Sequence, residues 1–296
     1  MSKVPTTAAF VSQKGGVGKS TLARVLAVGA IHRGRKTLLA DFDLDQLTCV
    51  EWGAARMRAG IEPEIDTRAF KSLKKLRKNE TVVDFIVADT RGLADDLSTE
   101  IAEDSDVVFL PTGVSLDDLR PTLGLAGKLA RRGAEGRLVV VLSKVGRSEI
   151  QFARAVETIE DAGFELLSEH WPQRDGFQSD LDAGRAGREA RNPHLREIAE
   201  RMEQALWART LKAKPRGYRS SYFGSLVDVT APPSCGGAMM RQSTRKTVKA
   251  ARSSPRRLSV SARRGRKARL ADRGPGRSIG RRELRSARWR SGRPWP

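Results

Sequence analysis

Five segments in the first half of the chain are almost continuously apolar. They are Ala8–Ser12, Thr37–Ala40, Val82–Ala88, Val107–Leu110 and Leu138–Leu142. Apolar runs without alternation are typical of parallel strands that are buried on both faces. Weaker candidates for strands lie near Glu62–Thr67 and Glu165–Leu167. The pattern therefore predicts a mainly parallel sheet at the centre of the fold.

Segments with helical spacing alternate with these strands. We predict helices at Ser20–Arg33, Phe70–Lys78, Ser115–Arg132, Glu149–Ala162 and Pro193–Leu211. Phe70–Lys78 is short, and its exposed face is basic. Strand–helix alternation of this length predicts an α/β fold, with a doubly wound, mainly parallel sheet flanked by helices. Ligands in such folds bind at the carboxyl ends of the strands.

The composition of the chain changes after about Lys212. Residues 211–296 contain 24 Lys and Arg against 3 Asp and Glu, whereas residues 1–210 contain 31 against 32. The formal net charge of +20 therefore comes from the C-terminal part. This part is rich in Ser, Gly, Pro and Arg, and it lacks the apolar surface that would offset the entropy of ordering. We predict a folded domain at 1–210 and a disordered basic C-terminal tail at 211–296.

The basic tail has two interpretations, and the sequence leaves both open. As a DNA-binding arm, it would release many counterions from DNA and bind without sequence preference. An abrupt Arg-rich ending is also what off-frame or read-through translation of a G/C-rich gene produces. The hypothesis of DNA binding below therefore does not rest on the tail.

Several classes of protein are not indicated by the sequence. No apolar run approaches the roughly 18 residues that a membrane span requires, and residues 1–10 lack the pattern of a signal peptide. Two cysteines, Cys49 and Cys235, are too few for a disulfide scaffold and lack the spacing of a metal site. We expect a cytoplasmic protein in which Cys49 is buried and inert.

A glycine-rich loop joins the first predicted strand to the first predicted helix. It reads Lys14-Gly15-Gly16-Val17-Gly18-Lys19-Ser20-Thr21. The glycines allow several backbone N–H groups to point inward, and these groups form an anion site with the N-terminus of the helix. Lys19 can reach the β- and γ-phosphates of a nucleotide, and Ser20 can place its hydroxyl on Mg²⁺. We predict that this loop binds ATP together with Mg²⁺.

One departure from the usual phosphate-binding loop is informative. The usual pattern places Gly at position 13, where this chain has Gln13, and this loop instead begins with Lys14. The form K-G-G-V-G-K-[ST] resembles the deviant Walker A motif of the ParA/MinD/NifH group, which are P-loop NTPases of the SIMIBI-like class. The resemblance implies a homodimer that sandwiches ATP, in which Lys14 reaches the phosphates of the partner. A charge supplied in trans can stabilise the transition state, as an arginine finger does.

Carboxylates follow two of the predicted strands. Asp41 and Asp43 come after Thr37–Ala40, and Asp89 comes after Val82–Ala88. Side chains at i and i+2 of a strand point the same way. By resemblance to the D-x-D segment and the Walker B strand of the family, Asp43 orients or activates the attacking water, Asp41 lies near Mg²⁺, and Asp89 holds Mg²⁺ directly or through water. We thus predict catalytic roles for Lys14, Lys19 and Asp43, and metal binding by Ser20, Asp41 and Asp89.

Some positions depart from the pattern of the family. Leu44-Asp45-Gln46 stands where the family often has Pro-Gln-Gly, and Ser143 replaces an Asn that lies near adenine. A hydroxyl offers fewer hydrogen-bonding groups than an amide. The sequence therefore defines the recognition of the base less well than that of the phosphates.

The resemblance covers about residues 5–210 and implies a function. ParA members bind DNA non-specifically as ATP dimers and segregate plasmids or chromosomes. We predict a partition ATPase that is slow alone, that is stimulated by DNA and a ParB-like or other activating partner, and that is nucleoid-associated if it binds DNA. Membrane attachment of the MinD type is not expected, because Arg281–Pro296 has no apolar face. The cysteines do not support a NifH-type cluster.

Two alternative functions remain open at this point. In the first, the chain is a nucleotide-gated positioning or scaffold ATPase for a protein complex, as in cell division or conjugation, without direct DNA binding. In the second, it is a basic nucleic-acid-binding protein whose phosphate loop is vestigial. The affinity of the folded domain for DNA distinguishes the first alternative from a partition ATPase. The affinity of the chain for ATP distinguishes the second alternative from both.

Overall fold

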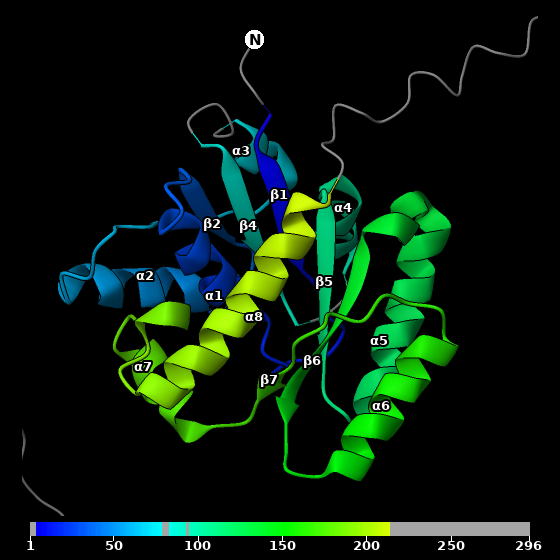
Figure 1. Ribbon diagram of the computed structural model, residues 1–296. Helices are drawn as coiled ribbons and strands as arrows, with labels where there is room; N and C mark the ends of the chain where they lie inside the picture. The colour runs from blue at the N-terminus through cyan, green and yellow to red at the C-terminus, as the bar shows by residue number, and fades with distance from the viewer. Residues whose placement is uncertain (1–3, 79–82, 93–94, 214–296) are drawn as a thin grey trace, which may run out of the picture. The chain divides into compact units, whose positions relative to one another are not determined.

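The computed structural model describes residues 4–78, 83–92 and 95–213. Within them, seven strands form one sheet in the order β3-β2-β4-β1-β5-β6-β7 (Figure 1). The strands are β1 Thr6–Phe10, β2 Thr37–Asp41, β3 Asp66–Ala69, β4 Phe85–Asp89, β5 Val107–Thr112, β6 Leu138–Val145 and β7 Trp171–Pro172. All six pairs of neighbouring strands are parallel. The predicted doubly wound α/β fold is therefore confirmed.

Helices cover both faces of this sheet. One face carries α1 Lys19–Ile31, α2 Thr48–Arg58, α7 Asp175–Asp182 and α8 Pro193–Leu211. The other face carries α3 Leu73–Arg77, α4 Asp96–Asp104, α5 Leu116–Leu129 and α6 Glu149–Asp161. Successive residues of β1 alternate between the two cores, with Ala8 and Phe10 in one and Ala9 and Val11 in the other. This burial on both faces explains why the strands read as continuous apolar runs.

The predicted elements agree with the structure where the apolar signal is strong. The five main strands and the helices at α1, α5, α6 and α8 are confirmed, with ends shifted by a few residues. Only the last two residues of the weak strand at Glu62–Thr67 lie in β3, because Pro63 has no N–H to donate to a strand ladder. The weak strand at Glu165–Leu167 is reduced to one bridge between Val140 and Leu166, and the edge strand is β7 instead.

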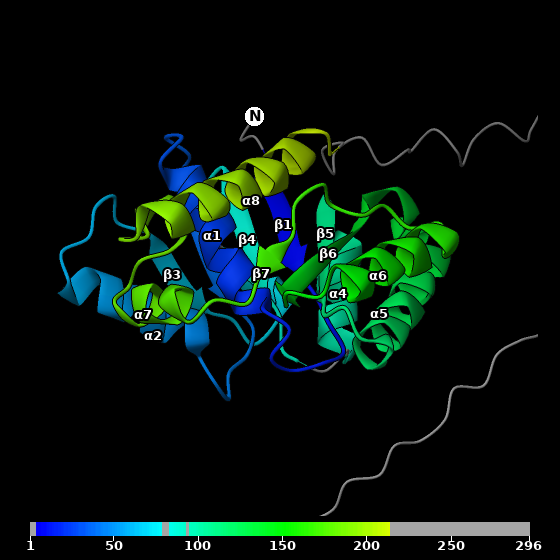
Figure 2. The ribbon, with the colours of Figure 1, turned by 60° about the horizontal axis from the view of Figure 1, so that its bottom comes forward.

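Three segments that the function needs end at the same edge of the sheet. In the strand register, Phe10 of β1 and Asp41 of β2 both lie opposite Asp89 of β4. Figure 2 brings this edge forward, with the deep-blue loop that follows β1. The glycine-rich loop and the ends of β2 and β4 are therefore neighbours in space. Within the described residues, no helix is long and apolar enough to cross a membrane, and the predicted tail lies outside them from residue 214 on.

Candidate nucleotide-binding site

The glycine-rich loop folds so that α1 begins without a capping side chain. Gly16 and Gly18 take the left-handed φ values of 76° and 91° that favour glycine. Gly18 is the residue before the first turn of α1, and it has no side chain that could cap the N–H groups of that turn. A Cβ on Gly18 would lie 2.5 Å from the hydroxyl oxygen of Ser143, so no larger residue fits. The exposed N–H groups and the helix dipole together create a site for an anion.

Lys19 lies at the base of this loop. Its side chain is buried, with 6 % of the residue exposed. Burial lowers the pKa of Lys19, and the nearby carboxylates of Asp89 and Asp43 partly offset that shift. Gly92, in the segment after β4, packs closely against Gly15. A Cβ on Gly92 would lie 3.6 Å from Nζ of Lys19. The ammonium group is thus held between the phosphate loop and two acidic strand ends.

Asp89 is the carboxylate that best fits a bound magnesium ion. It is almost fully buried, its Oδ2 accepts a 3.2 Å hydrogen bond from Sγ of Cys49, and its Oδ1 has no partner within the described residues. Burial, together with Asp41, raises the pKa of Asp89 to about 6, against the effects of Ser20, Cys49 and Lys19. A carboxylate with a free oxygen beside the Ser20 hydroxyl is the donor set that Mg²⁺ takes from a phosphate loop. No cluster of three or more His, Cys, Asp or Glu in the described residues forms a separate metal site.

Asp41 is engaged by the backbone. Its Oδ2 accepts hydrogen bonds from the backbone N–H groups of Cys49 (2.8 Å) and Val50 (3.3 Å), and its Oδ1 accepts one from that of Asp43 (3.0 Å). The N–H groups of Cys49 and Val50 belong to the first turn of α2, whose N-cap residue Leu47 offers no capping side chain. Asp41 therefore caps α2 from outside the helix. Burial raises the pKa of Asp41, and the backbone hydrogen bonds oppose that shift.

Asp43 lies at the start of the segment between β2 and α2. It is 9 % exposed, and its Oδ1 accepts a 3.3 Å hydrogen bond from the backbone N–H of Gln46. The Asp43 carboxylate is close enough to Lys19 that its charge raises the pKa of Lys19, against the larger effect of burial. The structure thus brings together Lys19, Ser20, Asp41, Asp43 and Asp89 of the predicted site.

Lys14 is placed differently from the other predicted residues. Its side chain is half exposed and forms an ion pair with Asp118 in the first turn of α5. The hydrogen bond from Lys14 to Asp118 raises the pKa of Lys14. Ser115 donates a second hydrogen bond to the same carboxylate, over 2.7 Å. The ammonium group of Lys14 is therefore held at the rim of the site within its own chain.

Three further residues of the site were not assigned to it from the sequence. Cys49 is fully buried as expected, but it donates to Asp89, and burial keeps it a thiol by raising its pKa well above the usual value. Asp118 pairs with Lys14 from 104 residues away. Lys144 has a left-handed φ of 54°, and its Nζ lies 4.0 Å from the position of a Cβ on Gly16. No sequence motif marks the contacts of Cys49 and Asp118, because each depends on how the strands are ordered. Lys144 follows Ser143 at the strand end that, by resemblance to the family, lies near adenine.

A cavity of about 280 Å³ adjoins the phosphate loop. Its lining includes Gly18, Thr21, Ser143, Lys144, Gln173 and Asp175. The Ser143 hydroxyl is buried and has no partner within the described residues. The position and polar lining suit the base and ribose of a nucleotide whose phosphates occupy the loop.

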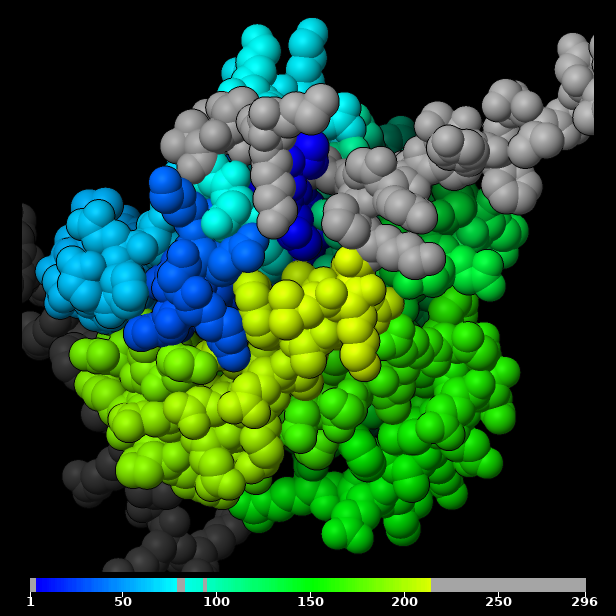
Figure 3. All heavy atoms as spheres, turned by 45° about the horizontal axis from the view of Figure 1, so that its top comes forward, coloured from blue at the N-terminus to red at the C-terminus, as the bar shows by residue number. Residues whose placement is uncertain are grey.

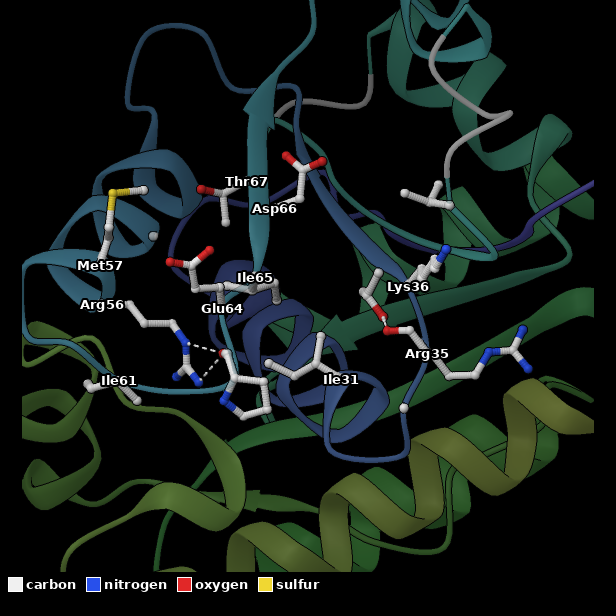
Figure 4. Close-up of a pocket in the computed structure, with 15 residues that line it drawn as sticks. Ile31, Arg35, Lys36, Arg56, Met57, Ile61, Glu64, Ile65, Asp66 and Thr67 are labelled. Carbon is white, nitrogen blue, oxygen red and sulfur yellow. Dashed lines mark hydrogen bonds between the residues drawn. The ribbon is translucent and has the colours of Figure 1, made fainter.

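A larger cavity, of about 620 Å³, lies at the far end of α1 from the loop. Figure 4 shows it between α1, α2 and β3, with Ile31, Ile65 and Met57 on its walls. The buried Arg56 closes one side through hydrogen bonds of 2.8 and 3.3 Å to the Pro63 carbonyl. This cavity is separate from the phosphate site, because α1 alone spans about 20 Å.

Residues 8–184 match the CobQ/CobB/MinD/ParA nucleotide binding domain. The chain belongs to this family. The match includes the loop, the D-x-D segment and Asp89, so the ParA/MinD-type resemblance read from these motifs is confirmed. No curated protein matches the chain.

Solved structures show the same fold in other ParA/MinD-type proteins. Apo McdA from Cyanothece is 16% identical, with a TM-score of 0.53, and the match covers 68% of this chain and 99% of McdA. A putative plasmid partition protein from Borrelia burgdorferi bound to AMPPNP is 17% identical (TM-score 0.55; 70% and 99% covered). MinD from Pyrococcus horikoshii, complexed with Mg-ADP, is 17% identical (TM-score 0.53; 69% and 98% covered). The P-loop NTPase fold of this family member is therefore shown.

Proposed function

We propose that the chain is a ParA-like ATPase that dimerises around ATP and acts in plasmid or chromosome partitioning through non-specific DNA binding. The observation that carries this proposal is Lys14. A second lysine at the head of a phosphate loop, half exposed at the rim, is available to a second subunit. Residues 1–210 form the ATPase domain in this proposal, and the complex is nucleoid-associated.

The residues of the site divide the work on ATP. The loop N–H groups and Lys19 hold the β- and γ-phosphates, where burial strengthens the interaction of the charges. Ser20 and Asp89 hold Mg²⁺, which when bound neutralises charge on the phosphates. Asp43 accepts a hydrogen bond from the attacking water and so orients it toward the γ-phosphate. Asp41 keeps the first turn of α2 beside Asp89, which makes it a positioning residue.

Lys14 connects nucleotide binding to dimerisation. In the single chain it is paired with Asp118, and in the dimer it leaves this partner for the phosphates bound by the other subunit. The site is incomplete until the second subunit arrives, so hydrolysis by the chain alone is slow. DNA and a ParB-like or other activating partner protein then stimulate turnover.

The test compares two lysine variants of the full chain with the wild type. Lys19→Ala should abolish ATP affinity and hydrolysis, because the buried charge at the phosphates is lost. Lys14→Ala should retain ATP affinity but lose the ATP-dependent dimer, as measured by calorimetry and light scattering. Hydrolysis unchanged by Lys19→Ala would overturn the catalytic assignment. A Lys14→Ala chain that still dimerises with ATP would overturn the role of Lys14.

A second candidate function is a positioning or scaffold ATPase for a protein complex. One observation favours it, because residues 1–210 carry almost equal numbers of basic and acidic residues. The fold is also similar to MinD from Aquifex aeolicus in its MinC:MinD complex (13% identity, TM-score 0.55). DNA binding that does not respond to ATP, alongside an intact ATP-dependent dimer, would favour this candidate over partition.

A further inference from the structure

One surface segment of the folded domain is strongly basic and has no role in the proposed ATP site. Residues 68–78 contain six Lys and Arg and no Asp or Glu. We call the five that are exposed the basic ridge, namely Lys71, Lys74, Lys75, Arg77 and Lys78. Outside this segment, residues 1–210 hold 25 Lys and Arg against 32 Asp and Glu, so the basic ridge is a local exception in an acidic remainder.

Three apolar residues fix the basic ridge to the fold. Phe70, Leu73 and Leu76 are 5 %, 2 % and 1 % exposed and pack into the core under α3 and α4. Their spacing leaves the basic residues between them outside. Figure 3 shows this cyan segment projecting at the upper edge of the view. The charges are therefore presented on a backbone that is held in place.

Three of the five charges of the ridge have no ion-pair partner among the residues that the structure describes. Arg77 pairs with Asp104, and Arg68, just before the ridge, pairs with Asp66. Lys71, Lys74 and Lys78 form no ion pair with any residue that the structure describes. Exposed lysines produce a positive potential that attracts a polyanion.

The ridge is also linked to the candidate ATP site. The backbone N–H of Phe70 donates a 2.8 Å hydrogen bond to the carbonyl oxygen of Asp41. The Phe70 ring packs on Phe42, with ring centroids 6.0 Å apart. Phe42 stands between Asp41 and Asp43, so the base of the ridge is in direct contact with the D-x-D segment.

We propose that the basic ridge is the surface through which the folded domain contacts the phosphate backbone of duplex DNA. This inference rests on the proposed function and names its DNA-binding surface. A protein partner is less well matched, because protein interfaces rely on apolar and aromatic anchors. The large apolar residues that are exposed in the described structure include none from 68–78. Lysines on a rigid base suit phosphates, which carry no sequence information.

The test measures how DNA affinity of the full chain depends on salt. The ridge variant carries Lys71→Gln, Lys74→Gln and Lys78→Gln. The control variant carries Lys128→Gln, Arg131→Gln and Arg154→Gln, which are exposed on α5, α6 and the turn after α5 and form no ion pair within the described residues. Both remove three positive charges, so net charge is matched. Fluorescence anisotropy with a short duplex of arbitrary sequence follows binding, with a non-hydrolysable ATP analogue or with ADP.

Each phosphate contact contributes about 0.9 to the slope of log affinity against log salt concentration. With the ATP analogue, we expect the slope of the ridge variant to be smaller in magnitude than the wild-type slope by about 2 to 3. The control variant should keep the wild-type slope. Unchanged ATP affinity in both variants shows that they fold. Equal slopes in the ridge and control variants would overturn the inference and would favour an acidic protein as the partner of the ridge.

The proposed function can fail without the inference failing. A chain of net charge +20 still associates with DNA at low salt, so the slopes remain measurable even without a response to ATP. Wild-type binding that is equal with the ATP analogue and ADP would reject nucleotide-gated partition. A shallower slope for the ridge variant under those conditions would still place DNA on the ridge.

Discussion

The carboxyl group of Asp89 has one oxygen bound by Cys49 and one that has no partner in the described structure. Burial, with Asp41, raises its pKa to about 6, so the folded state holds the proton more tightly than the unfolded chain does. The ligand-free protein therefore loses stability as the pH rises from about 4 to about 6, and the whole loss is present above about pH 6. Bound Mg²⁺ offsets this cost by pairing with the ionised carboxylate.

This balance predicts a pH-dependent effect of Mg²⁺ on ATP binding. Above pH 6, we expect Mg²⁺ to raise ATP affinity and the melting temperature of the ATP complex. Below pH 6, the effect should weaken roughly tenfold per pH unit, because protons compete with the ion. Calorimetry and thermal melts across this range measure both quantities. Asp89→Asn should remove the Mg²⁺ effect at every pH, and a wild-type effect that stays constant from pH 5 to 8 would contradict the prediction.

The ion pair between Lys14 and Asp118 predicts the response of the dimer to a single substitution. Asp118→Asn removes the negative charge that holds Lys14 within its own chain. We expect the ATP-dependent dimer to tighten by roughly two- to five-fold, because an exposed ion pair contributes little. Analytical ultracentrifugation with an ATP analogue measures the dimer dissociation constant.

Asp117 offers a matched control for this prediction. It lies next to Asp118, is exposed, and acts on Lys14 through its charge without a hydrogen bond. Asp117→Asn should therefore change the dissociation constant by less than Asp118→Asn. A dimer that weakens in Asp118→Asn would show that this carboxylate belongs to the dimer interface instead of restraining Lys14.

At the scale of residues, the loop and the acidic strand ends could be predicted because they are local in sequence. Gly16 and Gly18 occupy positive φ, and Lys19 follows directly, so eight neighbouring residues define the site. Asp118 could not be predicted, because its contact with Lys14 depends on the start of α5 lying beside the loop. The sequence also suggested Asp41 as a metal neighbour, while its carboxylate oxygens in fact accept from the backbone of Asp43 and the first turn of α2. Its contact with a metal ion stays a prediction.

At the scale of elements, a buried acidic residue holds the last helix on the domain. Glu203 of α8 is fully buried and accepts hydrogen bonds from Arg33, at 2.5 Å, and from Arg188, at 2.7 and 3.0 Å. Gly29 of α1 makes room for it, since a Cβ there would lie 2.4 Å from Cγ of Glu203. Because α1 starts at the phosphate loop, this cluster joins α8 to the element that carries the site.

Glu203→Ala should destabilise the protein by about 2–3 kcal/mol, because it removes charge-assisted hydrogen bonds from two partly exposed guanidinium groups. The midpoint of urea unfolding of the full chain measures the loss. Glu197→Ala is the control, because Glu197 is exposed on the same helix and, among the described residues, pairs with Arg201 four residues on. Its effect should stay below about 0.5 kcal/mol. Similar losses in the two variants would contradict a central role for Glu203.

The elements that the sequence did not predict share a physical cause. The buried face of α2 includes Gly53 and the charged Arg56, and that of α4 includes Ser98 and Thr99. Arg56 is buried because Glu189 binds both of its terminal nitrogens, at 2.5 and 2.8 Å. Polar residues on the buried face of a helix erase the apolar periodicity on which the prediction of a helix rests. The strong strands carry most of their buried polar residues at their ends, as with Thr37, Asp41 and Asp89, so their apolar runs stay continuous and their prediction succeeded.

At the scale of the whole molecule, the described core ends before the basic tail. The buried residues of the three apolar clusters lie within residues 8–206, and the partly buried Trp207 and Ala213 pack against them. Helix α8 ends at Leu211 with Lys212 as its C-cap. The proposed domain boundary near 210 therefore predicts that a chain ending at Ala213 folds. We expect it to unfold cooperatively and to bind ATP with the affinity of the full chain. A chain that aggregates or loses ATP affinity would show that the domain needs residues beyond 213.

The shortened chain also separates the basic ridge from the charge of the tail. Residues 1–210 have a net charge near zero, so DNA binding by this chain requires a local surface and not bulk charge. We expect it to bind duplex DNA at moderate salt with ATP and not with ADP, because only the dimer presents two ridges to one duplex and gains from their joint binding. Anisotropy at matched protein concentrations measures both states. Binding in neither state, with ATP-dependent dimerisation intact, would assign DNA contact to the tail and favour a positioning ATPase.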